Sequence, residues 1–538
     1  MKKLFFYPLM ILFIGLNSCE GEKGEPGSRE SSEAAGKSIA NASPDGIKTR
    51  ISSDNAIFEG GTLEEIYSQR DYKSLWTSGD AIHSFYNRLK ESDEEGLKFT
   101  DYHGQKIDSL LSINDLDEEN AAHLDLLLSD AFLTYAQHLY YGKLDPSELH
   151  KFWGINRKEK DFSSLLARGL DDKDFESVFN ELEPEHQVYH DLKKSLAEYK
   201  ELKENESPIN KIPRGELIKP GESDSRISAI TKRLQELQFL EVNSSNADST
   251  YSETLLEAVK TFQKSKSIQT DGIIGNSTID ELNKGPRDIY NQILANLERW
   301  RWYPRDLGEH YILVNIPHFK LAVIKEGDTV RQHNVIAGAK ERPTPIFSDT
   351  VNHLVINPTW TVPPTIKSED ILPKMAADPS YLRKNNMIVT GPNGERVNPS
   401  KVNWSSSDAM NYNFMQQAGP SNPLGRVKIM YPNKYLIYLH DTPAKSLFGQ
   451  TQRAESSGCV RVENAIDLSA YIVENQPEWQ KDRIEETIQS GETTTVNVDR
   501  PIQVHHLYWT AWRAGNETVI INDVYDLDEQ IYTKLILD

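Results

Sequence analysis

Two side chains in the C-terminal half of the sequence have the types and spacing needed for acyl transfer through a thiol. Cys459 lies in the run Ser456-Ser457-Gly458-Cys459-Val460-Arg461, and His440 precedes it by nineteen residues. A thiol attacks only as the thiolate, and a nearby imidazole favours that form by lowering the thiol pKa. Glycine at 458 allows close backbone approach and leaves N–H groups free to face a substrate oxygen. We therefore predict Cys459 as a nucleophile and His440 as its base.

These residues alone leave open which histidine is the base, which group orients it and whether the thiol is reactive. His505 and His506 follow the cysteine by 46 and 47 residues and are the alternative bases. No Asp or Glu is obviously placed to orient the imidazole, a task that a backbone carbonyl can perform. The order of His before Cys argues against a papain-like protease. A buried, inert thiol is the structural alternative for Cys459.

Short β-rich runs surround the pair and predict the scaffold that positions it. Val427 to Met430 and Tyr435 to Leu439 predict a hairpin, with His440 at the end of its second strand, where scaffolds present side chains to clefts. Asn464 predicts the cap of a helix that continues through Ile472. Further strands are predicted at 311–315, 321–324, 351–356 and 518–521. We expect a mostly-β domain over 308–538, with a polar lid inserted at about 365–417.

The sequence before this domain predicts helices. Apolar residues recur at helical spacing through 51–225, which we interpret as a helical scaffold with a linker-like stretch at 204–225. Residues 226–284 predict a three-helix module with a tight turn at Asp271-Gly272. One more scaffold helix is expected within 285–307, stopped by Pro304. The fold class is therefore multidomain α+β.

The N-terminus predicts an export signal. Two lysines precede the apolar run Leu4 to Leu16, which is shorter than the roughly 20 residues of a membrane span. The segment Leu16-Asn17-Ser18-Cys19 resembles a bacterial lipobox, which implies a signal peptide over 1–18 and lipidation of Cys19. Residues 19–50 are rich in Glu, Gly and Ser and predict a flexible tether. The alternative is an ordinary signal peptide with a chance cysteine.

The composition disfavours several classes of function and of site. The 538 residues carry a net charge of −21, which disfavours nucleic-acid binding. Only two cysteines occur, too few for a disulfide framework or a Cys-rich metal site. No His, Asp and Glu cluster has ligand spacing, so we expect no metal and no cofactor.

The motifs together resemble a known family. His440-Asp441-Thr442-Pro443 followed by Ser457-Gly458-Cys459-Val460-Arg461 resembles the active site of the L,D-transpeptidase (YkuD-type) catalytic domain. Supporting motifs are Asn357-Pro358-x-Trp360-x-Val362-Pro363 and Gly419-Pro420-x-Asn422-x-Leu424-Gly425. The 226–284 module resembles a peptidoglycan-binding domain, with a longer stretch at 243–252 in place of the usual glycine. The whole chain resembles the large periplasmic subclass of L,D-transpeptidases, which has a helical scaffold and a lid.

The resemblance implies 3-3 peptidoglycan cross-linking by ping-pong acyl transfer from a tetrapeptide stem, with loss of D-Ala. It implies that Cys459 attacks, that His440 moves the protons, and that backbone around Gly458 holds the oxyanion. Stem peptides and glycan are the implied partners, with a membrane reached through lipid on Cys19, and the implied location is the periplasm-facing cell envelope. Alternatives are an L,D-carboxypeptidase, attachment of a protein to the wall, and a non-catalytic wall-binding lipoprotein. The substrate-binding candidates are Arg461, Ser457, Trp360 and Tyr438.

Overall fold

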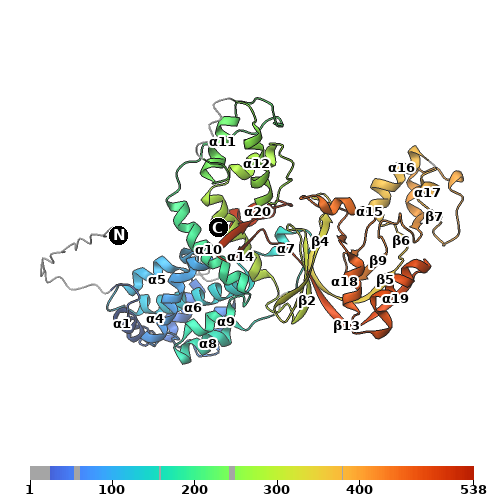
Figure 1. Cartoon of the computed structure of the whole chain (residues 1–538). Helices are drawn as coiled ribbons and strands as arrows, with labels where there is room; N and C mark the ends of the chain where they lie inside the picture. Colours follow the sequence, from blue (N-terminus) through green and yellow to red (C-terminus); the bar gives the residue numbers. More distant parts are fainter. Residues whose placement is uncertain (1–24, 54–60, 157–158, 242–248, 379, 538) are drawn as a thin grey trace. The chain divides into compact units, whose positions relative to one another are not determined.

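The computed structural model describes residues 25–53, 61–156, 159–241, 249–378 and 380–537 (Figure 1). The predicted signal peptide and Cys19 lie outside these residues, so lipidation stays a prediction. The chain forms two compact units. The first comprises most of the chain up to Leu182, and the second consists mainly of Glu183–Asp538 with segments 94–96 and 138–159. No helix in the described part of the chain is long and apolar enough to cross a membrane.

The first unit is helical, as the leucine spacing predicted. Its core is an aromatic cluster in which Trp76 and Phe175 stack at 5.0 Å and Phe85 lies against Phe132. A buried carboxylate, Asp125, accepts hydrogen bonds from the Trp76 amide and the Tyr67 hydroxyl. The helices up to residue 182 are α1 (Arg29–Ile39), α2 (Pro44–Ser53), α3 (Gly61–Ser68), α4 (Gly79–Lys90), α5 (Gly104–Leu111), α6 (Glu118–Tyr141), α7 (Pro146–Leu149, in the second unit), α8 (Phe162–Asp172) and α9 (Phe175–Leu182).

The prediction of a flexible tether over 19–50 is wrong for 29–39 and 44–50, which belong to α1 and α2. Helix α1 packs against α4 through small residues, so its low apolar content does not prevent burial. A Cβ on Gly36 would lie 3.0 Å from the Gly79 nitrogen, and one on Gly79 would lie 2.5 Å from the Glu33 Cα. Close backbone approach thus supplies the packing that the sequence pattern did not reveal.

In the second unit, helices α10 (Gln187–Glu204) and α14 (Pro286–Trp302) pack against each other. The predicted three-helix module is inserted between them and consists of α11 (Ile227–Glu236), α12 (Glu253–Ser265) and α13 (Asn276–Leu282). It has its own apolar core, and Gly272 takes a φ of +73° in the predicted turn. Part of the predicted linker belongs to this module, because Ile212 and Ile218 are buried in its core.

A closed sheet forms the centre of the second unit. Its strand order among the described residues is β1-β5-β13-β2-β3-β4-β12-β10-β9, and β9 also pairs with β5, which closes the sheet on itself. The bounds of its strands are β1 (Trp153–Gly154), β2 (His310–Asn315), β3 (Lys320–Lys325), β4 (Asp328–Gly338), β5 (Ile346–Ile356), β9 (Val427–Met430), β10 (Leu439–His440), β11 (Ala454–Ser456, beside β4), β12 (Val460–Val462) and β13 (Thr494–Leu507).

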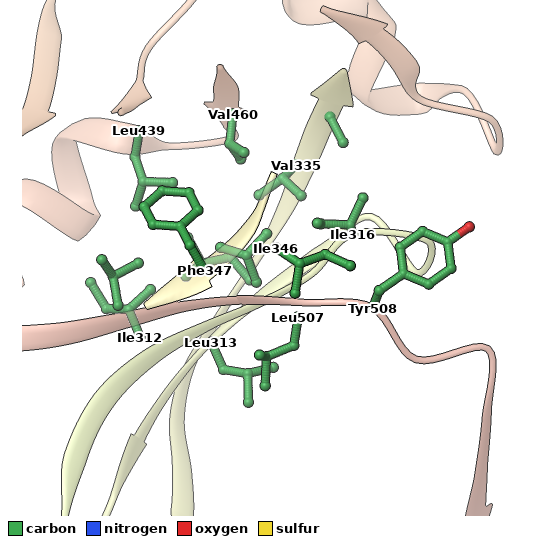
Figure 2. Packing of buried hydrophobic residues seen from close by; sticks show 14 of the residues in the cluster. Ile312, Leu313, Ile316, Val335, Ile346, Phe347, Leu439, Val460, Leu507 and Tyr508 are labelled. Atoms are coloured by element: carbon green, nitrogen blue, oxygen red, sulfur yellow. The ribbon is translucent and has the colours of Figure 1, made fainter. Parts of the chain in front are cut away.

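Side chains from all sides of this sheet fill one core. Figure 2 shows Ile312, Val335 and Phe347 packed with Leu439 and Val460, all of them buried. The fold class is the predicted mixed α+β arrangement. Four further elements follow or flank the sheet: α18 (Ala465–Ile472), α19 (Lys481–Ser490), the pair β14 (Ala511–Ala514) and β15 (Glu517–Ile520), and α20 (Asp528–Leu537).

Several sequence predictions of local structure need correction. The second hairpin strand is limited to Leu439–His440, because Leu436 takes a φ of +58° and breaks the extended run. Helix α18 is present as predicted, but Asn464 has a φ of 54° and its side chain makes no capping hydrogen bond. Helix α20 was not predicted in a domain expected to be mostly β.

The segment predicted as a lid is a small packed body rather than a polar, helix-like stretch. It contains α15 (Pro364–Ile366), α16 (Leu372–Ala377), α17 (Tyr381–Lys384) and the sheet β6 (Trp360–Thr361), β8 (Asn413–Gln416), β7 (Met387–Thr390). Its own apolar core includes Met375, Trp404 and Phe414. We call residues 358–425 the insertion. Its two ends are joined to each other, since the Asn422 side-chain amide donates to the Pro358 carbonyl at 3.1 Å.

Candidate active site

The loop that carries the thiol bends over the end of β4. Strand β11 runs parallel to β4 through Ala454 and Ser456, and β12 returns antiparallel to it through Arg461 and Val462. Residues 457–459 form the connection, which we call the Cys loop. Gly458 takes a φ of +107° there, and a Cβ would lie 3.3 Å from the Ile437 side chain. The positive φ therefore favours glycine here, and the space beside it is tight for any side chain.

Half of the polar backbone atoms of the Cys loop are already hydrogen-bonded. The Gly458 N–H donates to the Ser456 hydroxyl at 3.1 Å, and that hydroxyl donates to the Cys459 carbonyl at 2.6 Å. The sequence predicted free N–H groups at both residues, so the prediction needs correction for Gly458. Among the described residues the Cys459 N–H has no hydrogen-bond partner, which leaves it available to a substrate oxygen.

Strand pairing places His440 on the same face as Cys459. Strands β10 and β12 are parallel, with Leu439 opposite Val460 and His440 opposite Arg461. Leu439 and Val460 both point into the buried core (Figure 2). Because side chains alternate along a strand, His440 lies on the opposite face of β10 from Leu439, and the same alternation places Cys459, directly before β12, on the side of His440, where it still packs against the edge of the core.

The orientation of the His440 ring is fixed by a backbone carbonyl, as the sequence allowed. Its Nδ1 lies 2.5 Å from the carbonyl oxygen of Asp441. A carbonyl only accepts, so Nδ1 carries the proton and Nε2 is left as an acceptor. Burial lowers the pKa of His440 to about 3, and the positive charges of Arg461 and Lys428 act in the same direction. The imidazole is therefore neutral at ordinary pH.

The thiol is also neutral at rest. Burial raises the pKa of Cys459, while hydrogen bonds from Tyr438 and the charges of Lys428 and Arg461 partly oppose that rise. The sulfur lies 3.8 Å from the Leu436 carbonyl oxygen. The sequence-based expectation of a thiol with a lowered pKa is wrong for this resting state. The geometry suits a neutral thiol beside a neutral base.

Lys428 is a member of this face that was not predicted from the sequence. It lies opposite His440 in the β9–β10 pairing, and its Nζ is 3.8 Å from the centroid of the Tyr438 ring. Burial lowers the pKa of Lys428, and the negative charge of a Cys459 thiolate opposes that shift. The signal was the alternation in Val427-Lys428-Ile429, which puts the lysine on the face away from the core.

The predicted substrate-binding residues divide into two groups. Tyr438 lies beside Cys459, and Arg461 follows on the same face of β12. Ser457 is exposed on the Cys loop. Trp360 instead belongs to β6 of the insertion, where it packs against the insertion's own core.

The alternative bases both have other partners. His506 bonds through Nε2 to the Tyr431 hydroxyl at 2.9 Å and stacks on Phe347 at 4.8 Å. His505 lies between the Ser348 hydroxyl at 2.8 Å and the Leu307 carbonyl at 3.0 Å. Both rings therefore serve the packing of β13 rather than the Cys loop.

Asp441 supports the segment after His440. Its carboxylate accepts from the Arg426 amide at 2.9 Å and forms an ion pair with Lys445. Gly425, with a φ of +61°, passes so close that a Cβ would lie 2.3 Å from the carboxylate oxygen. The Asp441 side chain thus holds the shape of this turn, and its backbone carbonyl is the group that meets His440.

One arginine joins the Cys loop to the insertion. Arg342 Nη1 donates to the Ser457 hydroxyl at 2.9 Å and to the Asp370 carboxylate at 2.8 Å. Glu369 adds a second carboxylate 3.6 Å from the same guanidinium. Arg342 therefore attaches the insertion to the Cys loop. Within the described residues no group of three or more His, Cys, Asp or Glu side chains is arranged to hold a metal ion.

Comparison with known proteins gives three family matches. They are a scaffold domain at residues 61–196, a "Putative peptidoglycan binding domain" at 223–282, and an L,D-transpeptidase catalytic domain at 309–498. A curated relative from Haemophilus influenzae, named "Putative L,D-transpeptidase", is 35% identical over 244 residues, covering 45% of this chain and 49% of the relative. The chain thus spans about half the length of that relative.

The solved structures are less similar in sequence to this chain than the curated relative is. An L,D-transpeptidase from Xylanimonas cellulosilytica is 14% identical with a TM-score of 0.17, over 56% of this chain and 100% of that one. An L,D-transpeptidase from Stackebrandtia nassauensis is 14% identical with a TM-score of 0.20, over 55% of this chain and 97% of that one.

The resting protonation states predict an unusual pH profile for Cys459. Alkylation by iodoacetamide requires the thiolate, so the rate should rise only in the alkaline range, above the midpoint of a free thiol at about 8.5. His440→Ala should leave the profile nearly unchanged, because a neutral imidazole does not stabilise the thiolate. Free cysteine, alkylated under the same conditions, is the control. A rate plateau below about pH 7 that disappears in His440→Ala would reveal a thiolate–imidazolium pair and contradict the neutral resting state.

Proposed function

We propose that this protein, which carries an L,D-transpeptidase catalytic domain at residues 309–498, forms 3-3 cross-links in peptidoglycan through a Cys459 thioester. The observation that carries the proposal is the face shared by Cys459 and His440. His440 ends β10, Cys459 directly precedes the neighbouring parallel strand β12, and the His440 ring is held by the Asp441 carbonyl. The chain also carries a peptidoglycan-binding domain, which supports peptidoglycan as the substrate.

In the first half-reaction, the donor is a tetrapeptide stem that ends in D-Ala. His440 Nε2 accepts the thiol proton as the Cys459 sulfur attacks the carbonyl between the third residue, a diaminopimelate or similar diamino acid, and the D-Ala. The tetrahedral intermediate places its negative oxygen toward the Cys459 N–H. Collapse of the intermediate breaks the C–N bond, and His440 returns the proton to the departing D-Ala amine.

In the second half-reaction, the side-chain amine of another stem attacks the thioester carbonyl. His440 accepts the amine proton and returns it to the Cys459 sulfur as the new amide forms. The protein is then back in its resting state. Water in place of the amine gives the L,D-carboxypeptidase reaction with the same residues, and an amine of another protein gives attachment of that protein to the wall.

Positive charge near the sulfur favours the negative charge that develops in the transition state, while it opposes the positive charge on His440. The neutral thiol and imidazole form no ion pair at rest, whereas the attack develops negative charge on the carbonyl oxygen and positive charge on His440. The Lys428 and Arg461 cations lie near enough to the sulfur to oppose the rise in its pKa. Groups that are fixed in place before the reaction stabilise developing charge at no cost in reorganisation.

The roles of Cys459 and His440 are tested by substitution. With purified tetrapeptide muropeptides, Cys459→Ala should abolish turnover and the covalent adduct with a carbapenem, whose strained lactam offers a carbonyl to a thiolate. His440→Ala should slow acylation by about 100-fold or more, the scale of a lost general base. Higher pH should partly restore acylation in His440→Ala, since solvent then deprotonates the thiol, but it should restore nothing in Cys459→Ala.

Mass spectrometry of the muropeptide products separates the proposal from its rivals. Cross-linked dimers identify the transpeptidase, trimmed tripeptides alone identify the carboxypeptidase, and no product from wild type identifies a non-catalytic wall-binding protein. An adduct on Cys459→Ala, or full activity of His440→Ala at neutral pH, would exclude the assignment of these residues.

We further propose that the insertion acts as a lid that protects the thioester from water. The support is Arg342, which bonds the Cys loop and the insertion at once. Arg342→Ala should raise hydrolysis relative to cross-linking by up to about fivefold, because a partly exposed ion pair contributes about 1 kcal/mol or less. Asp370→Asn should act in the same direction.

The matched control for the lid is the ion pair Lys384–Asp378, which lies within the insertion and away from the Cys loop. Lys384→Ala should leave the product ratio unchanged. An unchanged ratio in Arg342→Ala, measured from the same product mixtures, would show that this contact does not govern access of water.

The peptidoglycan-related domains indicate a location in the cell envelope. We propose attachment there through lipid on Cys19, which rests on the lipobox-like sequence alone. The intact mass of the mature protein tests it: the lipidated form begins at Cys19 and is heavier by its acyl groups, and Cys19→Ala should lose them. A wild-type mass without lipid would refute the anchor.

A further inference from the structure

A buried hydrogen-bond network holds the Cys loop on its buried side. Thr344 is 2% exposed, and its hydroxyl donates to the Gly458 carbonyl at 2.8 Å. The same hydroxyl accepts from the Gly338 N–H at 2.9 Å. The Thr344 N–H donates to the Tyr525 hydroxyl at 3.2 Å, and that hydroxyl donates to the Gly338 carbonyl at 2.7 Å. Thr344, Gly338 and Tyr525 thus form a closed ring of bonds, from which the Thr344 hydroxyl reaches the Gly458 carbonyl.

The turn that presents Thr344 is tightly packed. It leaves the end of β4 at Gly338 and returns at the start of β5. A Cβ on Gly338 would lie 2.6 Å from the Thr344 nitrogen and 2.3 Å from the Arg342 carbonyl. Thr344 is thus held by the backbone as well as by hydrogen bonds, which makes its hydroxyl a fixed donor.

The hydrogen bond from Thr344 fixes the orientation of the Gly458 carbonyl and, with it, the orientation of the Cys459 N–H. That carbonyl and the Cys459 N–H belong to one peptide group, which is trans, as are all peptide bonds in the described residues. In a planar trans peptide the C=O and the N–H point in opposite directions. Fixing the carbonyl toward Thr344 therefore fixes the Cys459 N–H toward the opposite side.

Among the described residues, the Ser457 and Cys459 N–H groups are the backbone donors of the loop that have no hydrogen-bond partner. The Gly458 N–H and the Cys459 carbonyl both bond the Ser456 hydroxyl. Gly458, with a φ of +107° and without a side chain, offers little resistance to rotation of the peptide plane. An external hydrogen bond is therefore needed to hold the plane in one orientation.

We infer that Thr344 is a positioning residue that aims the Cys459 N–H at the oxyanion of the tetrahedral intermediate. The inference rests on the proposed acyl transfer and adds a residue from outside the Cys loop and the His440 strand. Thr344 acts through the peptide group and does not itself touch the substrate.

The test compares two reactions of the same sulfur. Acylation by a carbapenem develops an oxyanion, whereas alkylation by iodoacetamide is a direct displacement that develops none. In the full chain, Thr344→Val keeps the shape and removes the donor. It should slow acylation by about 10- to 100-fold, approaching the effect of losing one oxyanion donor. Alkylation at the same pH should change by less than about twofold, and Thr344→Ser should restore acylation to within a few-fold of wild type.

Tyr525→Phe provides a second variant that keeps the inference testable if Thr344→Val does not fold. It removes the hydroxyl that fixes the Thr344 backbone and should lower acylation less than Thr344→Val, again with little change in alkylation. Equal losses in both reactions, unchanged acylation, or failure of Thr344→Ser to recover would each overturn the inference. Failure of the proposed function is seen separately, as wild-type protein that forms no adduct at Cys459.

Discussion

The parallel pairing of β10 with β12 is the constraint on which the site depends. Parallel neighbours cannot be joined by a tight turn, so the chain must leave His440 and return to Cys459 by a crossover. The alternation of side chains then places Leu439 and Val460 in the core and their neighbours on the opposite face. A slip of one residue in this register would turn the thiol and the imidazole toward the apolar core and turn the two apolar residues away from it. The free energy of core packing therefore enforces the relative placement of His440 and Cys459.

Burial also determines the charge state from which catalysis starts. Removing water from His440 lowers its pKa to about 3, and removing water from Cys459 raises its pKa. Both shifts favour the neutral forms, so desolvation opposes an ion pair that simple proximity would favour. In the proposed reaction the proton moves only as the sulfur attacks, when Lys428 and Arg461 stabilise the negative charge that develops and oppose the positive charge on His440. Such a thiol is protected from reaction with other electrophiles at neutral pH.

The sequence predicted those features that depend only on the type of a residue and on the residues near it in the chain. Cys459 and His440 were predicted as the reactive pair from their motifs, which stays a prediction, and the strands at 311–315 and 351–356 were predicted from their apolar runs and are confirmed. The central strand β13 was missed because its polar stretch Asp499-Arg500-Pro501 interrupts the pattern, at the point where its register to β5 shifts. Helix α1 was missed because glycine-mediated close packing leaves no apolar stripe.

Contacts between distant residues were beyond what the sequence could reveal. Lys428 and Thr344 have no motif of their own, and their importance arises from what strand pairing and a turn bring beside them. The pKa shifts were predicted with the wrong sign for Cys459, because the burial of a side chain depends on the whole fold. The occupied N–H of Gly458 likewise depends on the Ser456 rotamer, which the motif does not specify.

The insertion shows how an added body can remain coupled to such a site. It extends from the antiparallel pair β5–β9, and its base is held by the bond from the Asn357 N–H to the Arg426 carbonyl. In its proposed role as a lid, its own apolar core would let it move as one body, with the displacement concentrated at its base and at Arg342. Because Arg342 also bonds Ser457, release of the insertion removes one hydrogen bond from the Cys loop itself. The Thr344 bond to Gly458 lies on the buried side of the loop and does not involve Arg342's side chain. The loop can therefore lose its contact to the insertion while the Cys459 N–H keeps its direction.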